Sequence, residues 1–158
     1  MASGYNTTAS ESYSTALGSY TVASGYGSTA LGRYTTASGY YATTMGYSTT
    51  ASDWGSLVIG RYNSSGSSAT SASSFSTSNP AFVIGNGTSS ESSDAFKVMF
   101  NGDAYISSSL YLGGTAVTST AAEINYVDGV TSNVQTQLDS KQATITGAAT
   151  TIASSDLT

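Results

Sequence analysis

The chain has 158 residues and a formal net charge of −5, and only 8% of its residues are charged. Four basic side chains cannot neutralise many phosphates, so we expect neither nucleic acid nor an anionic membrane as a partner. The sequence contains no His and no Cys, which excludes the usual nucleophile–base pairs and zinc sites. We therefore expect no catalytic residues, no bound metal and no cofactor. No apolar run approaches the length needed for membrane insertion.

Residues 2–64 repeat every seven residues, and more strictly every fourteen. Ala-Leu-Gly triplets such as residues 16–18 alternate with Ala-Ser-Gly triplets such as residues 23–25. Seven residues suit one short strand and a tight turn, and a fixed period is the signature of a solenoid. The pattern predicts a parallel β-roll with two strands in each fourteen-residue coil and glycine at the bends. Glu11 stands in a glycine position, where it predicts an irregular coil.

The fourteen-residue period separates the two sheets of the predicted roll. Alternate residues of a strand face opposite ways, so we expect the alanines to lie between the sheets. A serine column then faces solvent from one sheet, and an apolar column faces outward from the other, formed by Leu17, Leu31, Met45 and Ile59. Large exposed apolar patches are unusual on soluble monomers. The spacing therefore predicts self-association through the apolar column.

The segments TTASGY (residues 35–40) and STALGSY (residues 14–20) resemble the head repeats of trimeric autotransporter adhesins. The resemblance covers residues 2–64. It implies a left-handed parallel β-roll and a parallel homotrimer on a bacterial surface. In such a trimer the apolar column would form part of the core.

Aromatic residues follow the glycine column along the whole repeat. One interpretation is a recognition surface for sugars or a protein receptor, since Tyr and Trp are favoured at interfaces. The other is a stack that only shields the turns and packs against neighbouring coils. Threonines at residues 7–8, 35–36 and 49–50 suggest a third, distant possibility, a solvent-facing array that binds ice. The candidate recognition residues are Tyr5, Tyr20, Tyr26, Tyr34, Tyr40, Tyr47, Trp54 and Tyr62.

The strict register is lost after residue 64. Residues 65–79 are rich in serine and predict an irregular passage. Residues 80–118 predict several strands, with Asn101-Gly102 as a hairpin signal between two apolar runs. Residues 82–106, FVIGNGTSSESSDAFKVMFNGDAYI, resemble a segment that follows such head repeats in bacterial surface fibres and phage tail fibres.

Helical spacing begins near residue 119. Thr120 and Glu123 have the spacing of a capping box, and Asp128-Gly129 interrupts the pattern, so residues 119–142 predict two short helices, the better from Val130 to Gln142. Spacings of three and four residues indicate a coiled-coil seam that contains Ile124, Val127, Val134 and Leu138. The resemblance to trimeric adhesins implies that this coiled coil is trimeric. Residues 122–141, AEINYVDGVTSNVQTQLDSK, resemble a repeat of phage tail fibres. Residues 143–158 are predicted to be extended or β.

The expected fold is therefore mainly all-β: a trimeric left-handed parallel β-roll, a short β segment and a short coiled coil. Because the chain opens inside a repeat, we expect a segment of a longer protein, with Met1 supplied by a start codon or by expression. The leading functional interpretation is a non-enzymatic, extracellular fibre segment of a phage tail, which spaces or presents receptor-binding surfaces. The alternative is a bacterial surface adhesin head that binds host matrix or cells. The distant alternative is an ice-binding or structural homopolymer solenoid.

Overall fold

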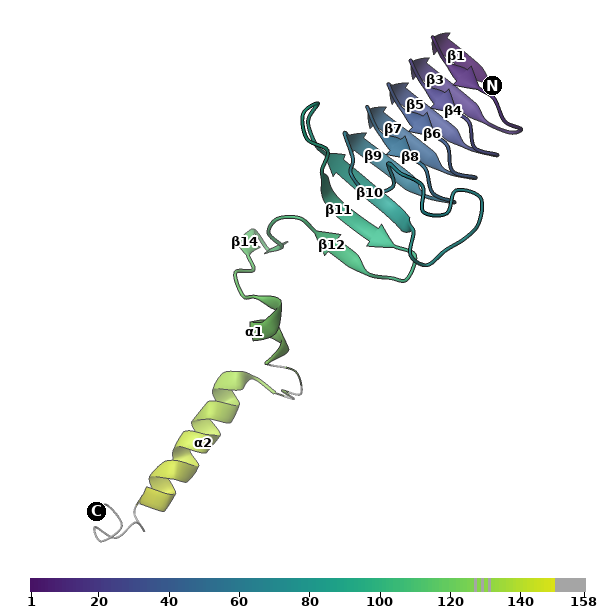
Figure 1. Ribbon diagram of the computed structural model, residues 1–158. Helices are drawn as coiled ribbons and strands as arrows, with labels where there is room; N and C mark the ends of the chain where they lie inside the picture. The colour runs from purple at the N-terminus through teal and green to yellow at the C-terminus, as the bar shows by residue number, and fades with distance from the viewer. Residues whose placement is uncertain (127, 129, 131, 150–158) are drawn as a thin grey trace. The chain divides into compact units, whose positions relative to one another are not determined.

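The computed structural model describes residues 1–126, 128, 130 and 132–149. Two compact units follow one another, residues 1–114 and the remainder from Thr115. The first unit is a parallel β-roll, seen in Figure 1 as a stack of thin rungs from β1 to β9. Its two sheets are built by strands that alternate along the chain, which is the parallel solenoid that the fourteen-residue period predicts.

The longer strands of the roll form one sheet of eight strands, ordered β1-β3-β5-β7-β9-β10-β11-β12. Its members from the repeat are β1 (Ala2–Tyr5), β3 (Thr15–Ser19), β5 (Thr29–Arg33), β7 (Thr43–Tyr47) and β9 (Leu57–Arg61). The second sheet has four two-residue strands, β2 (Thr8–Ala9), β4 (Val22–Ala23), β6 (Thr36–Ala37) and β8 (Thr50–Ala51). Every pair within the repeat is parallel with a register of fourteen residues, so equivalent residues stack directly.

Small side chains fill the space between the two sheets. The predicted alanine column is fully buried from the second coil onward, and Val58 and Val83 continue the core where the repeat ends. Threonine is also part of this core, because Thr21, Thr35, Thr44 and Thr49 are fully buried. The expectation that the threonine array faces solvent is therefore wrong for Thr35 and Thr49, so two of its six threonines cannot contact ice.

The buried threonines differ in whether their hydroxyls have a partner. Thr44 donates to the Thr49 hydroxyl at 2.6 Å, whereas the Oγ1 atoms of Thr21 and Thr35 have none. The difference arises because the position of Thr44 is held by alanine in the two preceding coils, Ala16 and Ala30. A buried hydroxyl without a partner carries its desolvation penalty uncompensated.

Exchanging these threonines for valine is expected to separate the two cases. Thr35→Val removes only an unpaired hydroxyl, so the free energy of unfolding should stay constant or rise by about 1 kcal/mol. Thr49→Val leaves the buried Thr44 hydroxyl without its acceptor and should lower that free energy by about 1–3 kcal/mol. Urea denaturation of both variants measures the difference, and an equal loss in both would contradict the assigned bonding.

The repeat glycines at residues 18, 32, 46 and 60 allow neighbouring strands to stack closely, whereas the sequence predicted them at the turns. Gly18, Gly32, Gly46 and Gly60 lie inside strands with φ between +97° and +131°, rather than at bends. A Cβ on any of them would lie within 2.2 Å of a carbonyl oxygen of the next rung. The turns with positive φ are instead made at residues 6, 20, 34, 48 and 62 on one edge and at residues 13, 27, 41 and 55 on the other. The expected irregularity at Glu11 does not occur, because Ser14 closes that turn as Ser28 closes the next.

The serine-rich passage, residues 63–79, contains no strand and closes the end of the four-stranded sheet. Asn63 occupies the position after Thr49 in its column, and its side-chain amide both accepts from and donates to the backbone of Thr50. It therefore takes the place of the backbone of a further rung. The buried carboxylate of Asp53 accepts from the backbone N–H groups of Thr70 and Ser71, at 2.6 and 2.8 Å.

This closure corrects the predicted solvent face of the serine column. Ser52 is buried beneath the passage: its N–H donates to the carbonyl of Gly66 and its hydroxyl donates to that of Ser67. Ser38 is half-buried, and its hydroxyl donates to that of Ser52. Ser24 is half-buried as well, and of the serine column only Ser10, in the first coil, is exposed.

The eight-stranded sheet continues beyond residue 64. Strand β10 (Pro80–Asn86) pairs in parallel with β9, so that residues 82–85 stack on residues 57–60. The hairpin predicted at Asn101-Gly102 follows, with β11 (Asp94–Met99) antiparallel to both β10 and β12 (Ala104–Ile106). Strand β13 (Tyr111–Leu112) ends the first unit.

The second unit begins with β14 (Thr115–Ala116) and contains two helices, α1 (Ala121–Asn125) and α2 (Val134–Ala149). The predicted capping box is confirmed at Thr120 and Glu123, and these hydrogen bonds from Thr120 hold the pKa of the Glu123 carboxyl below its usual value. Helix α2 starts later than predicted and runs past Gln142. Residues 143–149 are therefore helical rather than extended, and residues 150–158 lie outside the described part. Neither described helix has the length and hydrophobicity that crossing a bilayer requires.

Candidate functional site

The predicted apolar column lies on the outer face of the eight-stranded sheet, and it is longer than predicted. The residues alternate with the buried alanines, and Leu17, Leu31 and Ile59 remain partly exposed while Met45 is 38% exposed. The strand register then places three further apolar residues in the same line across β10, β11 and β12. We name this line the apolar row: Leu17, Leu31, Met45, Ile59, Ile84, Phe96 and Ile106.

A second line beside the apolar row widens it at the end of the roll. Thr15, Thr29 and Thr43 are followed in register by Leu57, Phe82 and Val98. The rings of Phe82 and Phe96 meet edge to face at 6.2 Å, which places both on one side of the sheet. The outer face thus changes from a single apolar line to a broader apolar surface. All these side chains keep part of their surface exposed in the single chain.

The residues proposed for the coiled coil are also exposed. Ile124, Val134 and Leu138 are each about half exposed, at 47%, 55% and 59%. Val127, the fourth predicted seam residue, lies outside the described residues. Short isolated helices are marginal in water, so exposed apolar side chains on α1 and α2 fit helices that depend on association. The coiled coil stays a prediction.

The predicted aromatic surface consists of two separate ladders, one on each edge of the roll. The first, the Tyr20 ladder, joins neighbouring rings at centroid distances of 4.9–5.9 Å and consists of Tyr5, Tyr20, Tyr34, Tyr47 and Tyr62. The second, the Trp54 ladder, consists of Tyr13, Tyr26, Tyr40, Tyr41 and Trp54 and continues to Phe75 and Phe100. Every predicted recognition residue belongs to one of them.

Several ladder tyrosines adopt a backbone conformation that tyrosine disfavours. Tyr20, Tyr34 and Tyr62 have φ of 54°, 56° and 43° on one edge, and Tyr13 and Tyr41 have φ of 62° and 58° on the other. Asn6 holds the equivalent turn in the first coil, with the residue type that suits this conformation. The left-handed region costs a side chain with a Cβ about 1–2 kcal/mol. The backbone conformation of these turns therefore does not account for the choice of tyrosine. The tyrosine rings must contribute something else, either stacking on neighbouring rings or recognition of a ligand.

The two ladders differ in charge. In the Tyr20 ladder, the Arg33 guanidinium lies 4.8 Å from the centroid of Tyr34 and 5.8 Å from that of Tyr47, and the Arg61 guanidinium lies 5.6 Å from that of Tyr62. Interaction with the Tyr62 hydroxyl raises the pKa of the Tyr47 phenol above its usual value. Sequence reasoning did not single out the two arginines, although their separation of 28 residues, two coils, was a visible signal.

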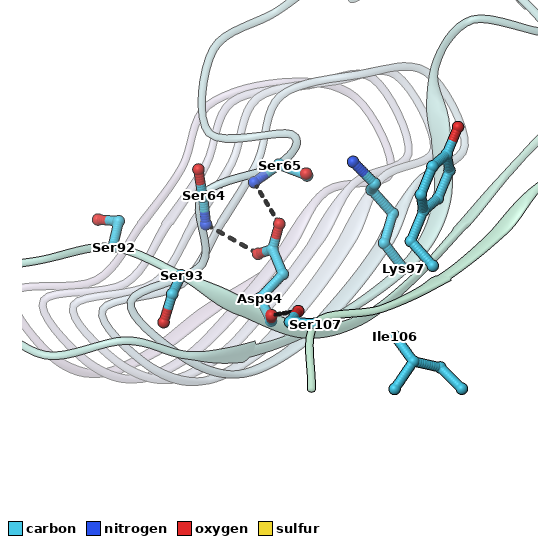
Figure 2. A pocket seen from close by; sticks show the side chains of 9 residues that line it. Ser64, Ser65, Ser92, Ser93, Asp94, Lys97, Ile106 and Ser107 are labelled. Carbon is cyan, nitrogen blue, oxygen red and sulfur yellow. Dashed lines mark hydrogen bonds between the residues drawn. The ribbon is translucent and has the colours of Figure 1, made fainter. Parts of the chain in front are cut away.

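A shallow hollow of about 510 Å³ lies where the serine-rich passage meets β11. Figure 2 shows the Asp94 carboxylate directed at the backbone nitrogens of Ser64 and Ser65, which donate to it at 2.8 and 2.9 Å. The Lys97 ammonium lies 4.6 Å from the ring centroid of Tyr105. Asp94 thus binds backbone N–H groups of the serine-rich passage, as Asp53 does. Across the described residues, His, Cys, Asp and Glu form no group suited to a metal ion.

Comparison with known proteins finds a family match inside the roll. Residues 1–21 and 23–49 match the model of the YadA head domain repeat in two copies. The match covers β1 to β7 and ends just before β8. It does not reach residues 80–158, so the resemblance of those residues to phage tail fibres gains no support. No curated protein and no solved structure matches the chain. Over residues 1–49, this β-roll is therefore similar to the head repeats of YadA.

Proposed function

We propose that this chain is part of the head of a trimeric adhesin, in which three parallel copies associate through the apolar row and present the roll outside the cell. The observation that carries the proposal is the apolar row itself, which is continuous over seven neighbouring strands and partly exposed in the single chain. The match to YadA head repeats supports an adhesin head on a bacterial surface rather than a tail fibre.

A parallel arrangement of the copies brings like surfaces of the apolar row together. The row runs along the stacking axis of the rungs, so a rotation axis parallel to it brings equal rungs of each copy to the same height. Leucine then meets leucine, and the broader surface around Phe82 meets its own copies. The number of copies rests on the similarity to trimeric adhesin heads. No catalytic step is part of this function, and binding acts through several weak contacts multiplied over three copies.

Sedimentation equilibrium of the whole chain tests the assembly. The expected species has three times the chain mass of 15.9 kDa. A folded species with the mass of one chain would contradict the proposal. Binding of the labelled assembly to immobilised matrix proteins and to intact cells tests adhesion, with an unrelated trimeric protein of similar mass as the control. An assembly that binds no surface would remove the adhesive part of the proposal.

A further inference from the structure

The Tyr20 ladder combines aromatic rings with cations that have no acidic partner among the residues that the structure describes. Within residues 1–114, the basic residues are Arg33, Arg61 and Lys97, and two of the three belong to this one edge. Among the described residues, the two guanidinium groups contact only tyrosine rings and the Tyr34 hydroxyl, which lies 3.4 Å from Arg33 Nη2. Neither is in an ion pair, so both are available to an anionic ligand.

The contact with tyrosine rings orients the guanidinium groups of Arg33 and Arg61 for binding an anionic ligand. A guanidinium that lies over a ring face keeps its fork of N–H donors free at its edge, where a carboxylate or sulfate binds with two parallel hydrogen bonds. The ring also limits the motion of the long side chain, which reduces the entropy lost on binding. Arg33 is held by Tyr34 and Tyr47, which makes it the better ordered of the two.

The spacing along the ladder favours a regular polymer. Arg33 ends β5 and Arg61 ends β9, with β7 between them in register. Two strand spacings separate the arginines by about 10 Å along the axis. This is close to the length of a disaccharide. Exposed tyrosine rings stand between and beside the two cations, at the heights where sugar rings would lie, and aromatic faces suit the apolar C–H faces of sugars.

We infer that the Tyr20 ladder binds an anionic polysaccharide that carries at least one negative charge on each disaccharide, laid along the axis of the roll. Arg33 and Arg61 hold successive acidic groups, and the tyrosines stack on the sugars between them. This inference rests on the proposed adhesive function and specifies its ligand. It excludes the Trp54 ladder, which lacks a basic residue and has the exposed carboxylate of Glu11 in the turn beside Tyr13.

The chain offers matched variants for a test by surface plasmon resonance with the intact assembly. The double variant Arg33→Gln with Arg61→Gln removes both cations of the ladder, and Lys97→Gln removes a cation that also lies over a tyrosine elsewhere. Tyr34→Asn removes a ring from the Tyr20 ladder, and Tyr41→Asn removes one from the Trp54 ladder at nearly the same φ. Asparagine suits that backbone conformation, so neither exchange strains the turn.

The probes are chondroitin sulfate and hyaluronan, with dextran as the neutral polysaccharide and polyglutamate as the acidic peptide. Binding to chondroitin sulfate should weaken with added salt, and the double arginine variant should lose about tenfold or more in affinity. Tyr34→Asn should lose severalfold, whereas Lys97→Gln and Tyr41→Asn should bind unchanged. Binding to hyaluronan as well would identify carboxylate as sufficient, and binding to chondroitin sulfate alone would identify sulfate.

Equal binding to dextran or polyglutamate, or full binding by the double arginine variant, would overturn the inference. A trimer that adheres to cells or matrix proteins but to neither anionic polysaccharide would also overturn it while leaving the proposed function intact. A monomer, or a trimer that adheres to nothing, would instead remove the proposed function on which the inference rests.

Discussion

Replacing Gly18 with alanine should prevent the roll from folding. The added Cβ would lie 1.9 Å from the carbonyl oxygen of Gly32 and 2.9 Å from its carbonyl carbon, and the residue has φ of +131°. Both obstructing atoms belong to the backbone of the paired strand β5, so no side chain can move aside. Relief requires breaking the register of the sheet, which we expect to lower the free energy of unfolding by more than about 4 kcal/mol.

The control for this prediction is Gly102→Ala. Gly102 also has a positive φ, +95°, but a Cβ there meets no atom within 4 Å. Its replacement therefore measures the backbone strain without the clash, about 1–2 kcal/mol. Far-ultraviolet circular dichroism and thermal unfolding compare the two variants. If Gly18→Ala melted at the same temperature as Gly102→Ala, the direct stacking of glycine on glycine would be wrong.

Replacing Leu31 with aspartate should dissociate the assembly without unfolding the roll. Leu31 lies in the middle of the apolar row, and removing one leucine side chain from an apolar contact costs about 2 kcal/mol. The new carboxylate would be buried in the interface without a partner. A trimer would contain three such carboxylates, one from each copy. We therefore expect the association constant to fall by several powers of ten, with the chain sedimenting as a monomer.

Two further variants make this result specific. Ser24→Asp places the same charge beside β4, on the opposite sheet, and should leave the mass of the assembly unchanged. Ile84→Asp lies outside the repeat but in the apolar row, and should dissociate the assembly as Leu31→Asp does. Dissociation by Ser24→Asp, or none by Leu31→Asp, would place the interface elsewhere. If Leu31→Asp dissociated the assembly and Ile84→Asp did not, the interface would be confined to the repeat.

Much of the roll could be predicted from the repeat because stacked rungs make like residues neighbours. The fourteen-residue period predicts both sheets, the parallel pairing and the buried alanines, and each is present in the structure. The threonine core was missed because alternation alone does not say which of two adjacent threonines faces inward. In Thr35-Thr36 and Thr49-Thr50 the first residue is buried, and only the path of the turn before it decides this.

The apolar row shows where local patterns stop being informative. Residues 82–85 have the same arrangement of a large apolar residue before glycine as residues 57–60, but the inserted passage separates them and hides the relation. The sequence also did not indicate that Asn63 and Asp53 close the end of the four-stranded sheet. Both side chains bind backbone groups that only the folded chain brings close to them.

The sequence by itself determined the period, the small-residue core and the presence of an apolar column, since in a solenoid these depend on spacing between neighbours. Tertiary structure alone decided that the column runs on through Ile84, Phe96 and Ile106, because strand pairing joins residues from outside the repeat. It also decided that the aromatic residues form two ladders and that only one of them carries Arg33 and Arg61. The reason is that successive turns lie on opposite edges of the roll, so residues seven apart in the sequence separate in space while residues fourteen apart come into contact.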